Sequence, residues 1–315
     1  MNDMVLNVVQ LLLVAGLAPL LTGLVRKVKA RLVGRVGPQL FQPYRDLARL
    51  LRKEVVLASN ASWLFRASPY LIFAAIWLAA AIVPTFATGL TVSRAGDLIA
   101  VVALLGTARF ALALAGMDIG TSFGGIGSSR EMMIASLAEP AMLMVTFTVA
   151  LLVHSTSLPH IADFFLLQAV GVRVSLGLGV VSLVMVAIAE NARIPIDNPA
   201  THLELTMVHE AMILEYSGRH LALIEAGAML KLTLYVSLIA AIFVPWGMAV
   251  GVPDARGFVI GLSSYVVKVA IGGVLLAAFE TTIAKMRVFR VAEFLGAALL
   301  LGTLAAIFLY VSRDV

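Results

Sequence analysis

The sequence contains no cysteine in its 315 residues. The chain can therefore form no disulfide bond, and it can hold neither an iron–sulfur cluster nor a metal bound by thiolates. Charged residues are also scarce, at 13% of the chain, whereas soluble globular domains contain about 25%. Hydrophobic residues make up 61%, and the mean hydropathy is +1.01. These values exclude an ordinary soluble domain and indicate an integral membrane protein.

Alternating strand patterns of about ten residues, which an outer-membrane barrel needs, are absent from the sequence. Long apolar runs are present instead, and about 20 mostly apolar residues carry a helix across the roughly 30 Å hydrocarbon core. The pattern predicts an all-α polytopic membrane protein with about eight transmembrane helices in a single domain, without visible repeats or linkers. The first run is interpreted as a span rather than a cleaved signal peptide, because basic residues follow it. The predicted spans are approximately residues 5–25, 70–90, 98–117, 132–154, 174–190, 221–247, 258–284 and 291–311.

Basic residues are concentrated in one set of connecting segments. Short loops rich in lysine and arginine stay on the cytoplasmic side of a membrane, so both termini are expected outside. The net charge of +5 is therefore read as an orientation signal and not as a sign of nucleic-acid binding. The predicted cytoplasmic loops are residues 26–66, 116–131 and 191–220. The first contains ten basic residues, namely Arg26, Lys27, Lys29, Arg31, Arg35, Arg45, Arg49, Arg52, Lys53 and Arg66.

The second half of the first loop places leucines and basic residues at helical spacing. Leu47, Leu50 and Leu51 lie opposite Arg45 and Arg49 on a helical projection, which predicts an amphipathic helix against the membrane. Anchoring to anionic lipid and docking of a partner protein are equally compatible with this pattern. A second amphipathic segment, residues 158–171, is too short to span and is expected at the outer interface.

Six charged residues fall within or at the ends of the predicted spans. A charged side chain at the bilayer centre costs about 2.5–3.5 kcal/mol, so such residues usually face protein or water and are paired. Glu139 is followed by Pro140, which removes a helical hydrogen bond beside the carboxyl group. Structural ion pairs explain single cases, whereas several in one bundle favour a polar path for protons or other ions. The six candidates are Arg109, Glu139, Glu190, Lys231, Lys268 and Glu280.

The third loop contains the stretch RIPIDNPATHLELTMVHEAMILEYSG. Two prolines bar a regular helix at its start, and the pattern over residues 201–216 is compatible with a helix. His202 and His209 are seven residues apart, which is too far for one metal ion without further ligands, and the His spacing of the zinc-protease helix is missing. The pattern favours a docking surface over a metal site.

Three motifs carry a resemblance to a known family. They are RVGPQLFQPYRDLARLLRKE, GSSREMMIASLAEP, and AENARIPID followed by EYSG, one in each predicted cytoplasmic loop. With the helix count, they cover nearly the whole chain. The sequence resembles the eight-helix membrane subunit shared by respiratory complex I, where it is the H subunit, and the group 4 membrane-bound nickel–iron hydrogenases, including formate hydrogenlyase.

Local motifs are closer to the hydrogenase branch of this family. QLFQPYRD follows Gly37 and Pro38 directly, whereas the corresponding complex I loop is several residues longer. AGMDIGTSFGGIGSSRE and AFETTIAKMR also resemble the hydrogenase form more closely. Two alternatives remain open: the H subunit of a complex I-type quinone oxidoreductase, with a quinone chamber behind the first loop, and a stand-alone secondary transporter.

The resemblance implies a non-catalytic subunit of an oxidoreductase complex in a bacterial or archaeal cell (inner) membrane. Its loops are expected to dock an iron–sulfur small subunit and a large hydrogenase-like subunit, which would carry the iron–sulfur clusters and a nickel–iron centre. Its buried charges would connect that arm to antiporter-like membrane subunits that move H⁺ or Na⁺, and its remaining surface would contact lipid. Residues expected to dock partners are Arg35, Gly37, Pro38, Tyr44, Arg45, Asp46, Asp118, Arg130, Arg193, Asp197, Glu210, Glu215 and Tyr216.

The third loop departs from the family's pattern. Where the family commonly has three carboxylates in a run like DLPEAESEL, this chain reads DNPATHLEL, so Ala200 and His202 stand in for two of them and Glu204 remains. Histidine titrates near neutrality. One hypothesis is that His202, Glu204, His209 and Glu210 replace the missing carboxylates as a proton relay. The other is that these residues form the solvated or partner-facing side of a docking helix.

Overall fold

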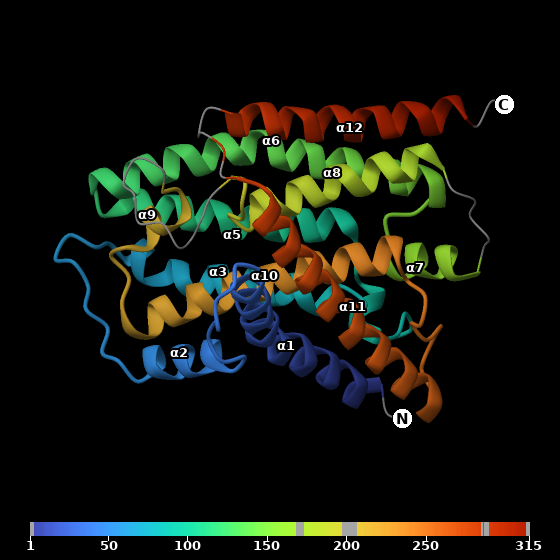
Figure 1. Ribbon diagram of the computed structural model, residues 1–315, viewed down its shortest axis with the longest axis horizontal. Coiled ribbons are helices and arrows are strands. Elements are labelled where there is room, and N and C mark those ends of the chain that lie inside the picture. Colours follow the sequence, from blue (N-terminus) through green and yellow to red (C-terminus); the bar gives the residue numbers. More distant parts are fainter. Residues whose placement is uncertain (1–2, 168–172, 197–206, 285, 287–289, 313–315) are drawn as a thin grey trace.

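The computed structural model describes residues 3–167, 173–196, 207–284, 286 and 290–312. Within these ranges the chain forms twelve helices and two isolated bridges, and no strand (Figure 1). The all-α class predicted from the apolar runs is confirmed. The helices are α1 (Asp3–Leu32), α2 (Gln42–Leu51), α3 (Trp63–Ile82), α4 (Thr91–Arg94), α5 (Leu98–Asp118), α6 (Ser122–Val153), α7 (Leu158–Leu167), α8 (Val174–Glu190), α9 (His209–Ile213), α10 (Gly218–Phe243), α11 (Ala255–Thr282) and α12 (Val291–Val311).

Seven of the described helices are long and apolar enough to span a membrane, namely α1, α3, α5, α6, α10, α11 and α12. Helix α8 has 17 residues, which gives a length of about 26 Å at 1.5 Å per residue. It packs against α6 and α12. Because about 17 residues is the lower limit for a transmembrane helix, these helices agree with the predicted number of about eight.

The long helices form one continuous bundle. Helix α12 packs on α6 and α8, α6 packs on α5, and α5 packs on α3. Helix α3 then packs on α10, α10 on α1, and α1 on α11. Figure 1 shows α2 and α9 toward one end of the bundle and α7 toward the other, with the N-terminal end of α1 and the C-terminal end of α12 on the side of α7. The segments with most basic residues therefore gather at the α2 and α9 end.

The expectation of a loop over residues 116–131 is wrong for most of that length. Helix α6 begins at Ser122, with Thr121 as its N-cap residue. The glycines and serines in this stretch favour a loop by propensity, but here their small size lets α6 approach α5 closely. Ser128 donates a hydrogen bond of 2.8 Å to the carbonyl of Ala113 in α5. The small residues thus serve helix packing and not chain reversal.

The predicted span at residues 70–90 is displaced toward the N-terminus, because α3 ends at Ile82. Pro84 follows closely, and the residue before a proline is disfavoured in helical conformation. Phe86 and Leu90 are fully buried and pack with Leu6 in a small second core. The apolar character of this stretch therefore reflects burial inside the protein.

The amphipathic helix predicted in the first loop is confirmed as α2, which packs on α1 and α10. Its Pro43 is buried and its Arg45 is exposed. The amphipathic segment expected at residues 158–171 forms α7, whose described part ends at Leu167. Of the helix expected over residues 201–216, the described residues contain the short α9.

Candidate functional site

Arg109, near the middle of α5, gathers three carboxylates and one lysine from other helices, and we call this set the Arg109 cluster. The Arg109 guanidinium forms an ion pair with Glu190. Its Nε lies 3.5 Å from Glu131 Oε1, and its Nη1 lies 3.4 Å from Glu139 Oε1. Lys231 Nζ lies 3.4 Å from Glu190 Oε2. Helices α5, α6, α8 and α10 therefore meet in one ionic network.

The Arg109 cluster is deeply buried and has an excess of negative charge. The Arg109 and Glu190 side chains are each 2% exposed. Buried ions persist only when they are paired and hydrogen-bonded, because desolvation of an isolated charge is costly. With all groups ionised, the cluster holds three carboxylates against two cations. The cluster therefore has one more carboxylate than cations.

Glu139 is the member of the cluster that reaches the outer surface of the α5–α6 pair. Its side chain is 41% exposed, whereas that of Glu131 is 9% exposed. Gly106 in α5 lies beside this carboxylate, because a Cβ added there would be 3.4 Å from Glu139 Oε1, an ordinary contact distance. Pro140 follows in the sequence and removes a helical hydrogen bond at this point. Glu139 therefore contacts Arg109 on one side and the surroundings of the bundle on the other.

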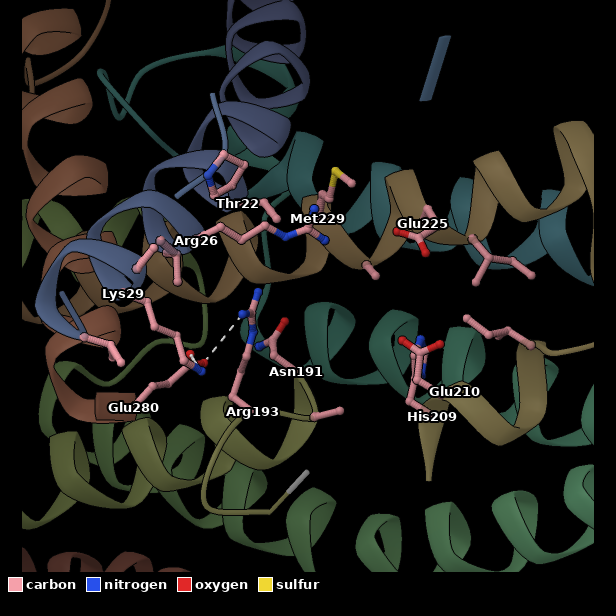
Figure 2. A pocket seen from close by; sticks show the side chains of 18 of the residues that line it. Thr22, Arg26, Lys29, Asn191, Arg193, His209, Glu210, Glu225, Met229 and Glu280 are labelled. Atoms are coloured by element: carbon pink, nitrogen blue, oxygen red, sulfur yellow. Dashed lines mark hydrogen bonds and ion pairs between the residues drawn. The ribbon is translucent and has the colours of Figure 1, made fainter. Parts of the chain in front are cut away.

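A cavity of about 800 Å³ opens between α1, α10, the end of α11 and the segment after α8 (Figure 2). Pockets for small organic ligands are lined mainly by hydrophobic and aromatic side chains. The lining of this cavity combines apolar side chains with four cations, three carboxylates and a histidine, and these charged groups suit water and ions. These residues are Arg26, Lys29, Arg35, Arg193, His209, Glu210, Glu225 and Glu280.

Glu280 is the main ionic contact inside this cavity. Lys29 Nζ lies 2.9 Å from Glu280 Oε2, and Arg193 Nη1 lies 3.5 Å from Glu280 Oε1. Figure 2 shows the three side chains converging from α1, the segment after α8, and α11. Burial lowers the pKa of the Arg193 guanidinium, and the charge of Glu280 acts in the opposite direction. Arginine remains protonated in proteins nonetheless, so Glu280 joins three elements through two charged contacts.

A smaller cavity of about 70 Å³ lies beside the Arg109 cluster. Arg109, Glu131, Glu190 and Lys231 line it. The two cavities are neighbours, because they share part of their lining, in which Asn191 and His209 are the polar residues. The shared residues are Asn191, Ala192, His209, Ile224 and Ala228.

Hydrogen bonds and one aromatic stack join the first and third loops. The Val56 amide donates to Ser217 Oγ at 2.8 Å, and Ser217 Oγ donates to the Val56 carbonyl at 2.9 Å. Tyr216 stacks on Phe65 with ring centroids 3.9 Å apart, and its hydroxyl donates to the Phe65 carbonyl at 3.0 Å. Burial raises the pKa of the Tyr216 hydroxyl, so it stays protonated and able to donate. The two loops therefore form one surface.

Residues 5–311 match the family described as NADH dehydrogenase. The chain belongs to this family. It is 31% identical over 279 residues to formate hydrogenlyase subunit 4 of Escherichia coli (strain K12), covering 89% of this chain and 90% of the relative. It is 33% identical over 233 residues to hydrogenase-4 component C of the same organism, covering 74% and 73%. With the H subunit of NADH-quinone oxidoreductase from Rubrobacter xylanophilus the identity is 28% over 247 residues, covering 73% and 71%.

A solved structure shows the same fold. A chain of the membrane-bound sulfane sulfur reductase, an archaeal respiratory membrane complex, matches this one with a TM-score of 0.83. The match covers 98% of this chain and 100% of the other at 20% identity, so it concerns the fold. The resemblance inferred from the three loop motifs is confirmed, and the chain is a membrane subunit of the NADH dehydrogenase family.

The structure brings four of the nine residues of the predicted ion path together. Arg109, Glu139, Glu190 and Lys231 belong to the Arg109 cluster. Glu280 lies in the large cavity, where it pairs with two cations. The described residues therefore form two separate ionic groups, where the sequence suggests a single set of candidates.

The four other residues predicted for the ion path lie outside these two ionic groups or outside the described residues. Lys268, in the middle of α11, forms no ion pair or hydrogen bond with any residue that the structure describes. His209 lines both cavities. His202 and Glu204 lie outside the described residues. The proposed exchange of carboxylates for histidines in the third loop therefore stays a hypothesis.

Some residues predicted to dock partners form contacts within the chain. Asp118 Oδ2 accepts a hydrogen bond of 2.9 Å from the Ser62 amide, and Arg130 Nη1 donates at 2.8 Å to the Met207 carbonyl. Tyr216 is buried against Phe65, as described above. These contacts give the side chains a role in holding the loops together.

The other predicted docking residues lie in the first loop, around the large cavity or on the surface. Tyr44 donates to the carbonyl of Gly16, and Asp46 pairs with Arg49 at 3.1 Å. Gly37 has a positive φ of 72°, which favours glycine. Arg35, Pro38, Arg193 and Glu210 line the cavity, Arg45 and Glu215 are exposed, and Asp197 lies outside the described residues.

Sequence reasoning misses four charged residues at the site: Arg26, Lys29, Glu131 and Glu225. Glu131 falls in a predicted loop because of the glycines before it. Thr121, which is a preferred N-cap residue, is the signal for an earlier helix start. Arg26 and Lys29 count as loop charges in the sequence, but α1 continues to Leu32 and brings both into the cavity.

Proposed function

We propose that this chain is the membrane anchor and ion-coupling subunit of a hydrogenase-type redox complex, similar to formate hydrogenlyase. The observation that carries the proposal is the Arg109 cluster, which lies beside a cavity that shares His209 with the large charged cavity and which includes the partly exposed Glu139. The greater similarity to formate hydrogenlyase subunit 4 and hydrogenase-4 component C supports the hydrogenase branch.

In this proposal the end of the bundle at α2 and α9 faces the cytoplasm and both chain termini face outside. A peripheral arm, with an iron–sulfur small subunit and a large hydrogenase-like subunit, docks there. The arm supplies the iron–sulfur clusters and the nickel–iron centre, and this chain supplies none of the catalytic groups. Antiporter-like subunits lie beside it in a bacterial or archaeal cell membrane. The joined first and third loops support this placement, because they offer a firm and strongly basic surface.

Ion transfer follows from how Arg109 is shared. A proton from the large cavity reaches Glu190 through the smaller cavity, and its binding weakens the ion pair between Glu190 and Arg109. The guanidinium then shifts toward Glu131 and Glu139, which lie within 3.5 Å of it already. Glu139 carries the cluster's proton at the start, and the approach of the guanidinium releases it toward a neighbouring subunit. The proton on Glu190 then passes to Glu139 as the guanidinium returns to Glu190, which restores the starting state. The groups need only small movements, because each is in contact before the proton arrives.

A second candidate is the H subunit of a complex I-type quinone oxidoreductase. The observation that favours it is the cavity of about 800 Å³ behind the first loop, which has room for a quinone headgroup. The charged side chains of this lining suit water and ions, and its apolar side chains, among them Val25, Ile213 and Met229, would contact a quinone. Extraction of the purified complex with organic solvent distinguishes the two, because a quinone oxidoreductase retains quinone and a hydrogenase-type complex does not.

The proposal is tested by purifying the tagged chain in mild detergent, identifying its companions by mass spectrometry, and assaying hydrogen production with a reduced dye. We expect iron–sulfur subunits to copurify and hydrogen to be produced. Copurified iron–sulfur subunits with bound quinone and no hydrogen production would establish the second candidate. A chain that purifies alone would contradict both.

A further inference from the structure

Lys268 is the one candidate of the predicted ion path that the described structure leaves without a partner. It is the 14th of the 28 residues of α11 and is partly buried. No ion pair or hydrogen bond joins it to any residue in the described ranges. Lys29, Arg109 and Lys231 differ from it in this respect, because each pairs with a glutamate.

The depth of Lys268 excludes a lipid headgroup as its partner. Helix α11 is about 42 Å long at 1.5 Å per residue, and Lys268 is about four turns from either end. The hydrocarbon core is roughly 30 Å thick. Lysines near the ends of a transmembrane helix extend their amine to the interface, but a side chain at the centre of α11 cannot reach it. The amine therefore needs an acceptor at mid-membrane depth.

The helix face that carries Lys268 borders α10. Ser264, one turn before it, donates to the Trp246 carbonyl at 3.3 Å. Gly272, one turn after it, lies so close to α10 that an added Cβ would be 2.7 Å from Val236 Cγ1. Residues four apart lie on one face of a helix. Lys268 therefore lies on the flank of α11 next to α10.

The surface beside this flank is apolar and poorly covered by the rest of the chain. In its most apolar stretch, 22% of the residues of α11 are buried, compared with 61% for α10. Lipid tails can cover aliphatic side chains but offer nothing to a protonated amine. The exposed neighbours of Lys268 on α11 are Val267, Ile271, Val274 and Leu275.

We propose that this face of α11 is the docking surface for a second membrane protein, whose transmembrane helix places an aspartate or glutamate carboxylate beside Lys268. Aspartate and glutamate are the side chains that carry a negative charge near neutral pH. Charged residues within a membrane usually pair with a group of opposite charge, so a carboxylate is the expected partner of the lysine. A second copy of this chain bound symmetrically through the same face would bring two lysines together, which disfavours a homodimer here. The inference rests on the proposed function, because it requires assembly with other membrane subunits.

The test compares the composition of complexes purified through the tagged chain carrying Lys268→Met, Lys268→Arg or Ile271→Met. Lys268→Met removes the charge at similar length, and Ile271→Met changes an exposed side chain one turn away without changing charge. Loss of one partner of a desolvated ion pair mainly speeds dissociation. We expect Lys268→Met to lower the amount of at least one membrane subunit by about tenfold or more, with the iron–sulfur subunits unchanged. Lys268→Arg and Ile271→Met should keep the wild-type composition.

Two results would contradict the inference, and only the second would also contradict the proposed function. Normal composition with Lys268→Met would contradict the inference and leave the proposed function intact. A wild-type complex that contains no other membrane subunit would contradict the proposed function as well. Because replacing a buried charge with an apolar side chain favours membrane insertion, Lys268→Met is expected to reach wild-type levels in the membrane.

The absence of cysteine from the chain gives a second, independent test. In Ile271→Cys the new thiol is the only one in this chain and Lys268 is kept, so a photo-crosslinker attached to it reports what lies beside α11. We expect cross-links to a transmembrane helix of another subunit, near an aspartate or glutamate. The matched variant Tyr310→Cys, exposed on α12, should not reach the same peptide. Cross-links from position 271 to lipid alone would contradict the docking surface.

Discussion

At the scale of single residues, Arg109 holds the site together. Its guanidinium is the one group that contacts all three carboxylates of the Arg109 cluster. Without it, Lys231 alone would face them, and its amine reaches only Glu190 at 3.4 Å. The balance between charges at this position therefore decides both the stability of the bundle and the ease of moving a proton.

Replacing Arg109 with methionine should strongly destabilise the protein. The change leaves buried carboxylates without their main partner, and breaking a buried pair in this way costs about 3–5 kcal/mol. Unfolding in mixed micelles, followed during a titration with sodium dodecyl sulfate, measures the loss. The control is Arg256→Met at an exposed position, which should change stability by less than about 0.5 kcal/mol. A loss at Arg109 as small as that at Arg256 would show that the cluster does not depend on this cation.

At the scale of elements, the sequence predicts helices well where apolar residues meet lipid and poorly where small residues meet another helix. The predicted bounds of α8 and α12 agree with the structure. The start of α6 is missed because its glycines and serines look like a loop until the partner surface of α5 is known. For the same reason Glu131 is not recognised from the sequence as part of the site.

The site itself could be predicted only as a set of candidates. The free-energy cost of placing a charge inside a membrane correctly predicts paired side chains within the spans. They are Arg109, Glu139, Glu190 and Lys231. Which residues pair could not be predicted, since that depends on how four separate helices pack. The same rule applies equally to Lys268, and only the structure separates it from the cluster.

The contact between the first and third loops makes a prediction at this scale. Tyr216→Ala removes both the stack on Phe65 and the hydrogen bond to its carbonyl, whereas Tyr216→Phe removes the hydrogen bond alone. A hydrogen bond of this kind contributes about 0.5–1.5 kcal/mol. We expect faster amide hydrogen exchange at residues 54–62 in Tyr216→Ala, with a much smaller change in Tyr216→Phe. Equal exchange in both variants and the wild type would mean that the loops are held together by other contacts.

At the scale of the whole molecule, the charged groups lie in three places. The large cavity lies where basic segments gather, the Arg109 cluster lies in the interior, and Glu139 meets the outer surface of α5 and α6. Lys268 lies on a different face, on α11. In the proposed function these are separate surfaces for a peripheral arm, for an exchange of ions and for a membrane neighbour.

The central claim is that ions reach a neighbouring subunit through Glu139, and proton uptake by vesicles that contain the purified complex tests it most directly. Wild type is compared with Glu139→Gln and with Glu293→Gln, a carboxylate exposed in the first turn of α12. The account predicts that Glu139→Gln keeps hydrogen production but loses proton uptake, while Glu293→Gln keeps both. Proton uptake by Glu139→Gln at the wild-type rate would contradict it.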